Sequence, residues 1–143
     1  MSQKSRSGRL AQVSTSNWGT IGELAVATWL LRKGYYVYHS MTPNAPFDLI
    51  VLVGKKTMVR IEVRTGYYDH RKQLIFSKSN PLRFDVMAVA LLDQGKVKFF
   101  RPLVATHLKK GLKVVPRNAQ AKVVYQSISF KRAVRIKRKD VIY

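Results

Sequence analysis

Two apolar segments joined by three turn residues constrain the fold more than any other feature of this sequence. The segments FDLIVLV (47–53) and TMVRIEVRT (57–65) are rich in β-branched residues, and GKK (54–56) separates them. Short strand-like runs separated by a Gly-containing turn predict an antiparallel β-hairpin.

The turn also predicts the register of this hairpin. If the turn is centred on Lys55, Val53 pairs with Thr57, and counting back along both strands places Asp48 opposite Glu62. Alternation then puts both carboxylates on one face of the sheet. Directly opposed residues have Cβ atoms about 4.5–5.5 Å apart, and like charges there destabilise the pairing.

Two opposed carboxylates need a positive charge between them. The chain has 27 Lys and Arg residues but only seven Asp and Glu residues, so an acidic residue inside an apolar strand is unusual here. Arg60 and Arg64 share the predicted face with Glu62 and would supply that charge. A divalent metal, which prefers oxygen ligands, would also supply it. The residues alone leave both options open.

The other apolar segments predict one long helix and four further strands. The helix is expected over 20–34 and the strands over 35–40, 74–78, 84–92 and 97–101. Thr20 and Glu23 have the spacing of a capping box at the helix start, and Gly34 suits its end. Apolar residues on nearly all sides predict that this helix is largely buried.

The chain divides into three parts by composition. Residues 1–16 are polar and Ser-rich and are expected to form a flexible basic arm, residues 17–102 a core, and residues 103–143 a basic C-terminal extension. A short helical turn is expected over 103–110. Periodicity leaves open whether the C-terminal end is a strand, a helix or a tail.

The net charge of +20 indicates a polyanionic partner. Nucleic acid is favoured over a membrane as that partner. A helix needs about 20 apolar residues to span a bilayer, and no apolar run approaches this length. No lipidation signal or signal peptide is visible either. The absence of cysteine excludes disulfides and thiolate ligands and fits a cytoplasmic, intracellular protein.

Basic residues expected to contact nucleic acid come from the arm, the hairpin turn, the loop and strand after it, and the C-terminal end. They are Lys4, Arg6, Arg9, Lys55, Lys56, Arg71, Lys72, Lys78, Lys131, Arg132, Arg135, Lys137, Arg138 and Lys139. Clustered Lys and Arg supply the electrostatic part of phosphate binding.

The order of these segments resembles the PD-(D/E)XK nuclease superfamily, over residues 17–102 or about three-fifths of the chain. The resemblance is carried by NWGTIGELAVATWLLRKGYYVY, PFDLIVLV and MVRIEVRTG, followed by FDVMAVALL and VKFFRP. It is similar in particular to the bacterial and phage endonucleases associated with group I introns, and more distantly to archaeal Holliday-junction resolvases. The resemblance implies an α/β, restriction-endonuclease-like core: a mixed β-sheet flanked by helices.

The resemblance also implies a site. Glu23 on the helix, Asp48 at the start of a strand, and Glu62 with Arg64 on the next strand match the catalytic positions of the family. Asp48, Glu62 and the Val63 carbonyl would hold Mg²⁺, or Mn²⁺ in its place. Glu23 suits the helix cap and the site equally well. Asp48 also suits a turn before a strand.

Arg64 departs from the family pattern, which has Lys at this position. An arginine stabilises negative charge and binds phosphate through a bidentate fork. It does not act as a base, because it stays protonated. Lys72 or Lys78 would be able to substitute from nearby segments.

Two hypotheses follow. The first is a Mg²⁺-dependent endonuclease that hydrolyses DNA, homing-endonuclease-like, with junction resolution as an alternative substrate choice. Double-strand cleavage by so small a chain implies a homodimer or homotetramer. The second is a nuclease-fold protein without catalysis that binds DNA or RNA, because fold does not establish activity.

Overall fold

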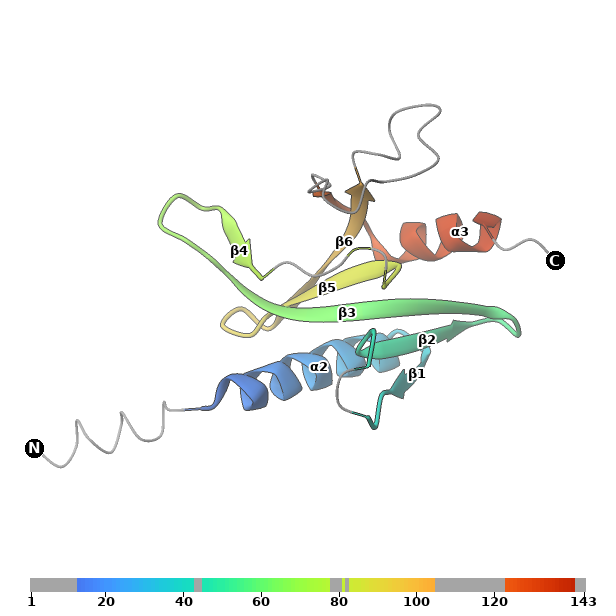
Figure 1. Cartoon of the computed structure of the whole chain (residues 1–143), viewed down its shortest axis with the longest axis horizontal. Helices are drawn as coiled ribbons and strands as arrows, with labels where there is room; N and C mark the ends of the chain where they lie inside the picture. Colours follow the sequence, from blue (N-terminus) through green and yellow to red (C-terminus); the bar gives the residue numbers. More distant parts are fainter. Residues whose placement is uncertain (1–12, 43–44, 78–80, 82, 105–122, 141–143) are drawn as a thin grey trace, which may run out of the picture.

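The computed structural model describes residues 13–42, 45–77, 81, 83–104 and 123–140. It contains these helices and strands: α2 (Thr15–Arg32), β1 (Tyr36–His39), β2 (Leu49–Val53), β3 (Thr57–Tyr68), β4 (Leu74–Phe76), β5 (Val86–Leu91), β6 (Lys96–Val104), β7 (Val123–Ser127) and α3 (Phe130–Asp140) (Figure 1). Four residues predicted to bind nucleic acid, Lys4, Arg6, Arg9 and Lys78, lie outside the described residues.

A mixed sheet forms the centre of the molecule, as predicted. Among the described residues, six of its strands follow the order β1-β2-β3-β5-β6-β7, and β4 pairs with the far end of β3. The β3–β5 pair is parallel and the other pairs are antiparallel. β3 runs the whole length of the sheet and joins its two halves (Figure 1).

The predicted hairpin register is confirmed. Val53 pairs with Thr57, and the β2–β3 ladder continues to Leu49 and Ile61. The ladder ends at the Leu49–Ile61 pair, one position short of Asp48 and Glu62, and the Asp48 N–H bonds to the Ile61 carbonyl. A local turn and the two-residue alternation of a strand were sufficient to predict the pairing from Val53 to Leu49.

Helix α2 begins earlier than the sequence predicted, and the Thr20–Glu23 capping box is wrong. The N-cap is Ser14, whose side chain accepts a hydrogen bond from the Asn17 N–H at 3.1 Å. Thr20 lies inside the helix and donates to the Ser16 carbonyl. Both Ser14 and Thr20 are good capping residues, so capping preference alone did not distinguish them.

The expectation that α2 is largely buried is also wrong. The buried positions are Gly22, Val26 and Leu30, which form one face against the sheet. Leu24 and Leu31 on other faces are 59% and 57% exposed. The helix is apolar on nearly all sides, but the structure covers one side only.

Gly22 lets α2 approach β3 closely. A Cβ atom at this position would lie 2.8 Å from the Thr65 Cγ2 methyl, whereas a Cβ at Gly19 would meet nothing within 4 Å. The close approach brings the next residue, Glu23, to the sheet.

We expect Gly22→Ala to be less stable than Gly19→Ala by about 1–3 kcal/mol, the cost of overpacking. Both variants gain the same helix propensity, about 1 kcal/mol for Gly→Ala, so the difference between them isolates the contact with Thr65. Urea unfolding of the two variants measures it. Equal stabilisation by both substitutions would show that the contact between α2 and β3 tolerates a methyl group.

The C-terminal part of the chain completes the core. β6 extends through Val104, so residues 103 and 104 belong to a strand rather than the predicted helical turn, and residues 105–110 lie outside the described residues. β7 pairs with β6. Helix α3 then packs Phe130, Ala133 and Val134 into the main core. The C-terminal part, whose secondary structure periodicity left open, therefore contains one strand and one helix.

Side chains pack on both faces of the sheet. The main cluster joins α2 and α3 to inward-facing residues of β2, β3 and β5, such as Val51, Val59 and Ala88. A second cluster on the opposite face contains Met87, Val89 and Phe100, with residues of β4 beside it. Within the described residues, no helix is long and apolar enough to cross a membrane.

Candidate active site

Asp48 lies where β2 and β3 separate. Its backbone N–H donates at 3.0 Å to the carbonyl of Ile61, the residue that pairs with Leu49 at the end of the ladder. Its side-chain Oδ2 accepts from the Val63 N–H at 2.8 Å. The carboxylate therefore takes the place of a backbone partner and is held beside the tripeptide Glu62–Arg64.

Glu62 is buried in the middle of β3, with 9% of its surface exposed. Its Oε1 atom forms an ion pair with Arg64 Nη2 at 2.8 Å. Arg64 Nη1 also donates to the Val63 carbonyl at 3.3 Å. One guanidinium thus contacts two of the three groups that were predicted to hold a metal.

Glu23 reaches the same place from α2. Its side chain is hydrogen-bonded to Asp48, and its Oε2 lies 2.6 Å from His39 Nε2. Sequence reasoning did not assign His39 a role, because it has no ligand spacing with the other histidines. The contact with Glu23 depends on the packing of α2 against β1, which the sequence pattern does not encode.

The pKa of Asp48 is raised to about 6. Burial is the main cause, and the charges of Glu62 and Glu23 and the hydrogen bond with Glu23 raise the pKa further. The Val63 N–H acts in the opposite direction. A carboxyl whose pKa is perturbed by burial and by specific charged neighbours is a mark of functional sites, although ion-pair networks also produce one.

The three acidic residues predicted for the site are therefore close together. Asp48 interacts electrostatically with both Glu62 and Glu23. Two carboxylates and a backbone carbonyl form an oxygen donor set of the kind Mg²⁺ and Mn²⁺ prefer. The part of the chain that the structure describes contains no group of three or more His, Cys, Asp or Glu side chains arranged to hold a metal. The predicted donor set needs only two carboxylates, so it fits such a cation.

Asp85 was missed by the sequence reasoning, although it repeats on the other side of β3 what Asp48 does. Its N–H donates to the Arg60 carbonyl, and its Oδ2 accepts from the Arg60 N–H, both at 2.9 Å. Arg60 binds it again through its side chain, with Nη2 3.0 Å from Oδ1. Lys137 of α3 lies 3.1 Å from the same oxygen.

Burial would raise the pKa of Asp85, but the hydrogen bonds from Arg60 and Lys137 hold it below its usual value. The matching sequence signal was present in the two Phe-Asp pairs, at 47–48 and 84–85. Burial raises the pKa of both carboxyls, but the hydrogen bonds from Arg60 and Lys137 reverse the shift at Asp85, so the two pKa values move in opposite directions.

The predicted nucleic-acid contacts lie in three described places. Lys55 and Lys56 lie in the β2–β3 turn, and Arg71 and Lys72 lie in the loop after β3. The exposed side of α3 carries Lys131, Arg132 and Arg135, while Lys137 turns inward to Asp85. Arg138 and Lys139 belong to α3, but their side chains lie outside the described residues.

Comparison with known proteins gives a match at the level of structure. No protein-family model matches the chain, and no curated protein sequence matches it. A solved structure of a bacterial homing endonuclease, I-Ssp6803I, matches with a TM-score of 0.52 and 16% sequence identity. The match covers 62% of this chain and 70% of that chain. The chain therefore shares the α/β fold of this endonuclease, which is the restriction-endonuclease-like fold that its sequence resemblance implied.

Proposed function

We propose that this protein is a Mg²⁺-dependent endonuclease that hydrolyses DNA phosphodiester bonds, in the manner of a homing endonuclease. One observation carries the proposal: where the β2–β3 ladder ends, the Asp48 carboxylate accepts from the Val63 N–H and lies close enough to Glu62 for that charge to raise its pKa. Glu23 joins them from α2. The fold shared with a homing endonuclease supports the same reading.

Asp48, Glu62 and the Val63 carbonyl would hold Mg²⁺ or Mn²⁺. The cation supplies polarisation of a phosphodiester oxygen and a more acidic water. Glu23 holds Asp48 in place by a hydrogen bond, and His39 holds Glu23. The positive charge of a bound cation would offset part of the rise in the pKa of Asp48 that burial, Glu62 and Glu23 cause.

Arg64 has two tasks in this proposal. Without substrate its guanidinium neutralises Glu62 and contacts the Val63 carbonyl. With DNA bound, Arg64 would contact the transferred phosphate, where a guanidinium stabilises developing negative charge. Glu62 would then be available, with Asp48, to hold the divalent cation.

DNA is the proposed partner, and the basic side of α3 with Lys131, Arg132 and Arg135 supports it.

We also propose a homodimer or homotetramer, since cutting both strands of DNA needs two active sites. Tyr36, Tyr38 and Met58 are 71%, 55% and 55% exposed, and the strand pairing puts them on one face of β1–β3. An exposed apolar patch of this kind is typical of interaction surfaces.

A second function is favoured by the contacts of Arg64. A guanidinium already bound to two predicted ligand groups does for the carboxylates what a metal would do. The chain would then be a nucleic-acid-binding protein, for DNA or RNA, that keeps a nuclease fold without catalysis.

Cleavage of supercoiled and four-way-junction DNA, with Mg²⁺ and with EDTA, tests the proposal. We expect Mg²⁺-dependent cutting that falls about a thousandfold in Glu62→Gln, because the metal supplies several kcal/mol of transition-state stabilisation. Arg64→Lys should increase the rate by about tenfold or more, since a lysine leaves Glu62 more readily and accepts a proton when its pKa is lowered.

The substrate that is cut separates a homing-type nuclease from a junction resolvase. Cutting only by Arg64→Lys would mean that this one residue keeps the site inactive. If neither the parent nor Arg64→Lys cuts, while salt-sensitive DNA binding persists, the catalytic proposal is wrong and the binding protein remains.

A further inference from the structure

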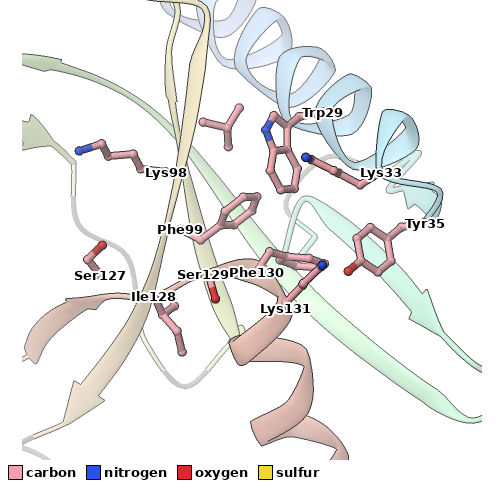
Figure 2. A pocket seen from close by; sticks show the side chains of 11 residues that line it. Trp29, Lys33, Tyr35, Lys98, Phe99, Ser127, Ile128, Ser129, Phe130 and Lys131 are labelled. Atoms are coloured by element: carbon pink, nitrogen blue, oxygen red, sulfur yellow. The ribbon is translucent and has the colours of Figure 1, made fainter.

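Three adjoining hollows form a groove between α2 and α3, away from the carboxylates. The largest is about 680 Å³ and lies between the end of α2, β6 and the start of α3 (Figure 2). A hollow of about 560 Å³ shares Trp29 and Lys33 with it. A third, of about 390 Å³, shares Tyr35 and Lys131. We call these three hollows the α2–α3 groove.

The floor of the groove is aromatic. Phe99 and Phe130 are buried beneath it, with ring centroids 5.0 Å apart. Trp29 lies 5.0 Å from Phe99, and Tyr35 lies 5.0 Å from Phe130. Trp29 and Tyr35 are only partly buried and line the hollow, so part of each side chain borders the groove.

The rim of the groove is basic. Lys33 places its Nζ 5.3 Å from the centre of the Trp29 ring, and Lys131 lies across the hollow from it (Figure 2). Arg32, Lys96 and Arg135 line the two flanking hollows. None of the described residues that line the three hollows is acidic.

Lys98 also lines the hollow, but its charged end does not belong to this rim. Its Nζ lies 5.2 Å from the centre of the Tyr68 ring, on the other face of the sheet. Ser129 borders the hollow at the N-terminus of α3, where its hydroxyl accepts from the Arg132 N–H. The positive end of α3 therefore adds to the charge of Lys33 and Lys131.

We propose that the α2–α3 groove binds a single-stranded segment of nucleic acid, with a base against Trp29 and Tyr35 and the neighbouring phosphates on Lys33 and Lys131. Aromatic platforms with a basic rim are the recurring design of single-strand sites. Base pairs inside a duplex have both faces covered by stacking, so a duplex would leave the aromatic floor unused. The cation–π contact of Lys33 is weak at an exposed site and yields readily to a phosphate.

This site is independent of the proposed catalysis. Glu23 and Trp29 lie on the same helix, about 9 Å apart along its axis, but on different sides of it. A segment held in the groove would therefore be an unpaired strand that leaves the catalytic carboxylates free for a different part of the nucleic acid.

Tryptophan fluorescence tests the proposal, because the chain has only two tryptophans, Trp18 and Trp29. In the full chain carrying Trp18→Phe, oligothymidylate should quench Trp29 by stacking and saturate. Lys33→Glu and Lys131→Glu should each weaken binding of a labelled oligothymidylate by about tenfold or more. Arg83→Glu makes the same charge change on an exposed residue outside the groove and should change it less than threefold.

Four results would overturn the assignment. Absence of Trp29 quenching, or equal losses in Arg83→Glu, would leave only general electrostatic attraction. Equal or tighter groove-dependent binding of a duplex would make this a duplex site. Binding of thymidine monophosphate as tight as that of the strand would make it a mononucleotide site. Asp48→Asn should keep full quenching, so failure of the nuclease proposal does not affect this result.

Discussion

Replacing Asp48 with Asn should stabilise the protein at neutral pH and remove its proposed cleavage activity. The carboxylate of Asp48 is partly buried and lies close to Glu62 and Glu23, and together these raise its pKa to about 6. At neutral pH the Asp48 carboxyl of the folded state is therefore ionised in surroundings that favour its protonated form. An amide has the same shape without the charge, accepts from the Val63 N–H, and donates to Glu23.

The effect of the Asp48 carboxyl on the free energy of unfolding depends on pH. The folded state holds the Asp48 proton up to about pH 6, whereas the unfolded chain releases it near pH 3.8. Stability contributed by Asp48 is thus fully present below about pH 4 and is lost as the pH rises to about 6. The side chain is only partly buried, so we expect the gain in Asp48→Asn at neutral pH to be about 1 kcal/mol.

Urea unfolding between pH 4 and pH 8 measures this difference. The stability curves of the parent and Asp48→Asn should converge near pH 4 and separate as the pH rises through 6. Asp93→Asn, an exposed acid in the β5–β6 turn, is the matched control and should leave the curve within about 0.5 kcal/mol. A variant that is less stable than the parent at neutral pH would mean that the carboxylate is stabilised where it lies.

The same substitution should lower Mg²⁺-dependent cleavage by about a thousandfold, since an amide is a poor partner for the cation. More stability with less activity is the expected signature of a functional site that costs stability. Mg²⁺ should also raise the unfolding midpoint of the parent at neutral pH and leave that of Asp48→Asn unchanged. Equal stabilisation of both proteins by Mg²⁺ would place the cation elsewhere.

The hairpin and its carboxylates were predictable because every step was local. A three-residue turn fixes the register, and alternation fixes the face, so Asp48 and Glu62 followed from counting. The position of Glu23 could not be predicted from local sequence alone. It depends on how closely α2 approaches β3. Gly22 allows this approach, but a glycine in a helix does not by itself indicate a close contact.

The helices were less predictable for physical reasons. Ser14 and Thr20 both cap helices well, and packing rather than propensity decides which one is used. The apolar surface of α2 suggested burial on every side, whereas the structure covers one side. For α3, basic and apolar residues alternate in a way that fits a strand or a helix. The packing of Phe130 and Val134 in the core decides in favour of the helix.

Asp85 shows the limit of local reasoning. Its partners Arg60 and Lys137 are 25 and 52 residues away in sequence. An acid after Phe84 reads as a turn residue until the parallel pairing of β3 and β5 is known. The parallel pairing places it against Arg60, and α3 then closes the cluster with Lys137.

Asp85→Ala should destabilise the protein by about 3 kcal/mol, the lower end of the cost of breaking a buried ion pair. The side chain of Asp85 is only 15% exposed, and its loss leaves the Arg60 N–H without its carboxylate partner. Arg60 is 40% exposed and regains some hydration, which limits the effect. Asp93→Ala is the control and should change the free energy of unfolding by less than about 0.5 kcal/mol.

Because the pKa of Asp85 is lowered, its contribution is present above the unfolded pKa near 3.8 and disappears as the pH falls through its folded value. Acid unfolding of the parent should therefore be steep below about pH 4, and shallower in Asp85→Ala. Lys137→Met removes one partner but keeps the Arg60 pair, so it should cost about 1 kcal/mol. Hydrogen exchange should show that loss first in the amides of α3. If Lys137→Met loosened α3 no more than Asp93→Ala does, the core packing of Phe130 and Val134 alone would hold this helix in place.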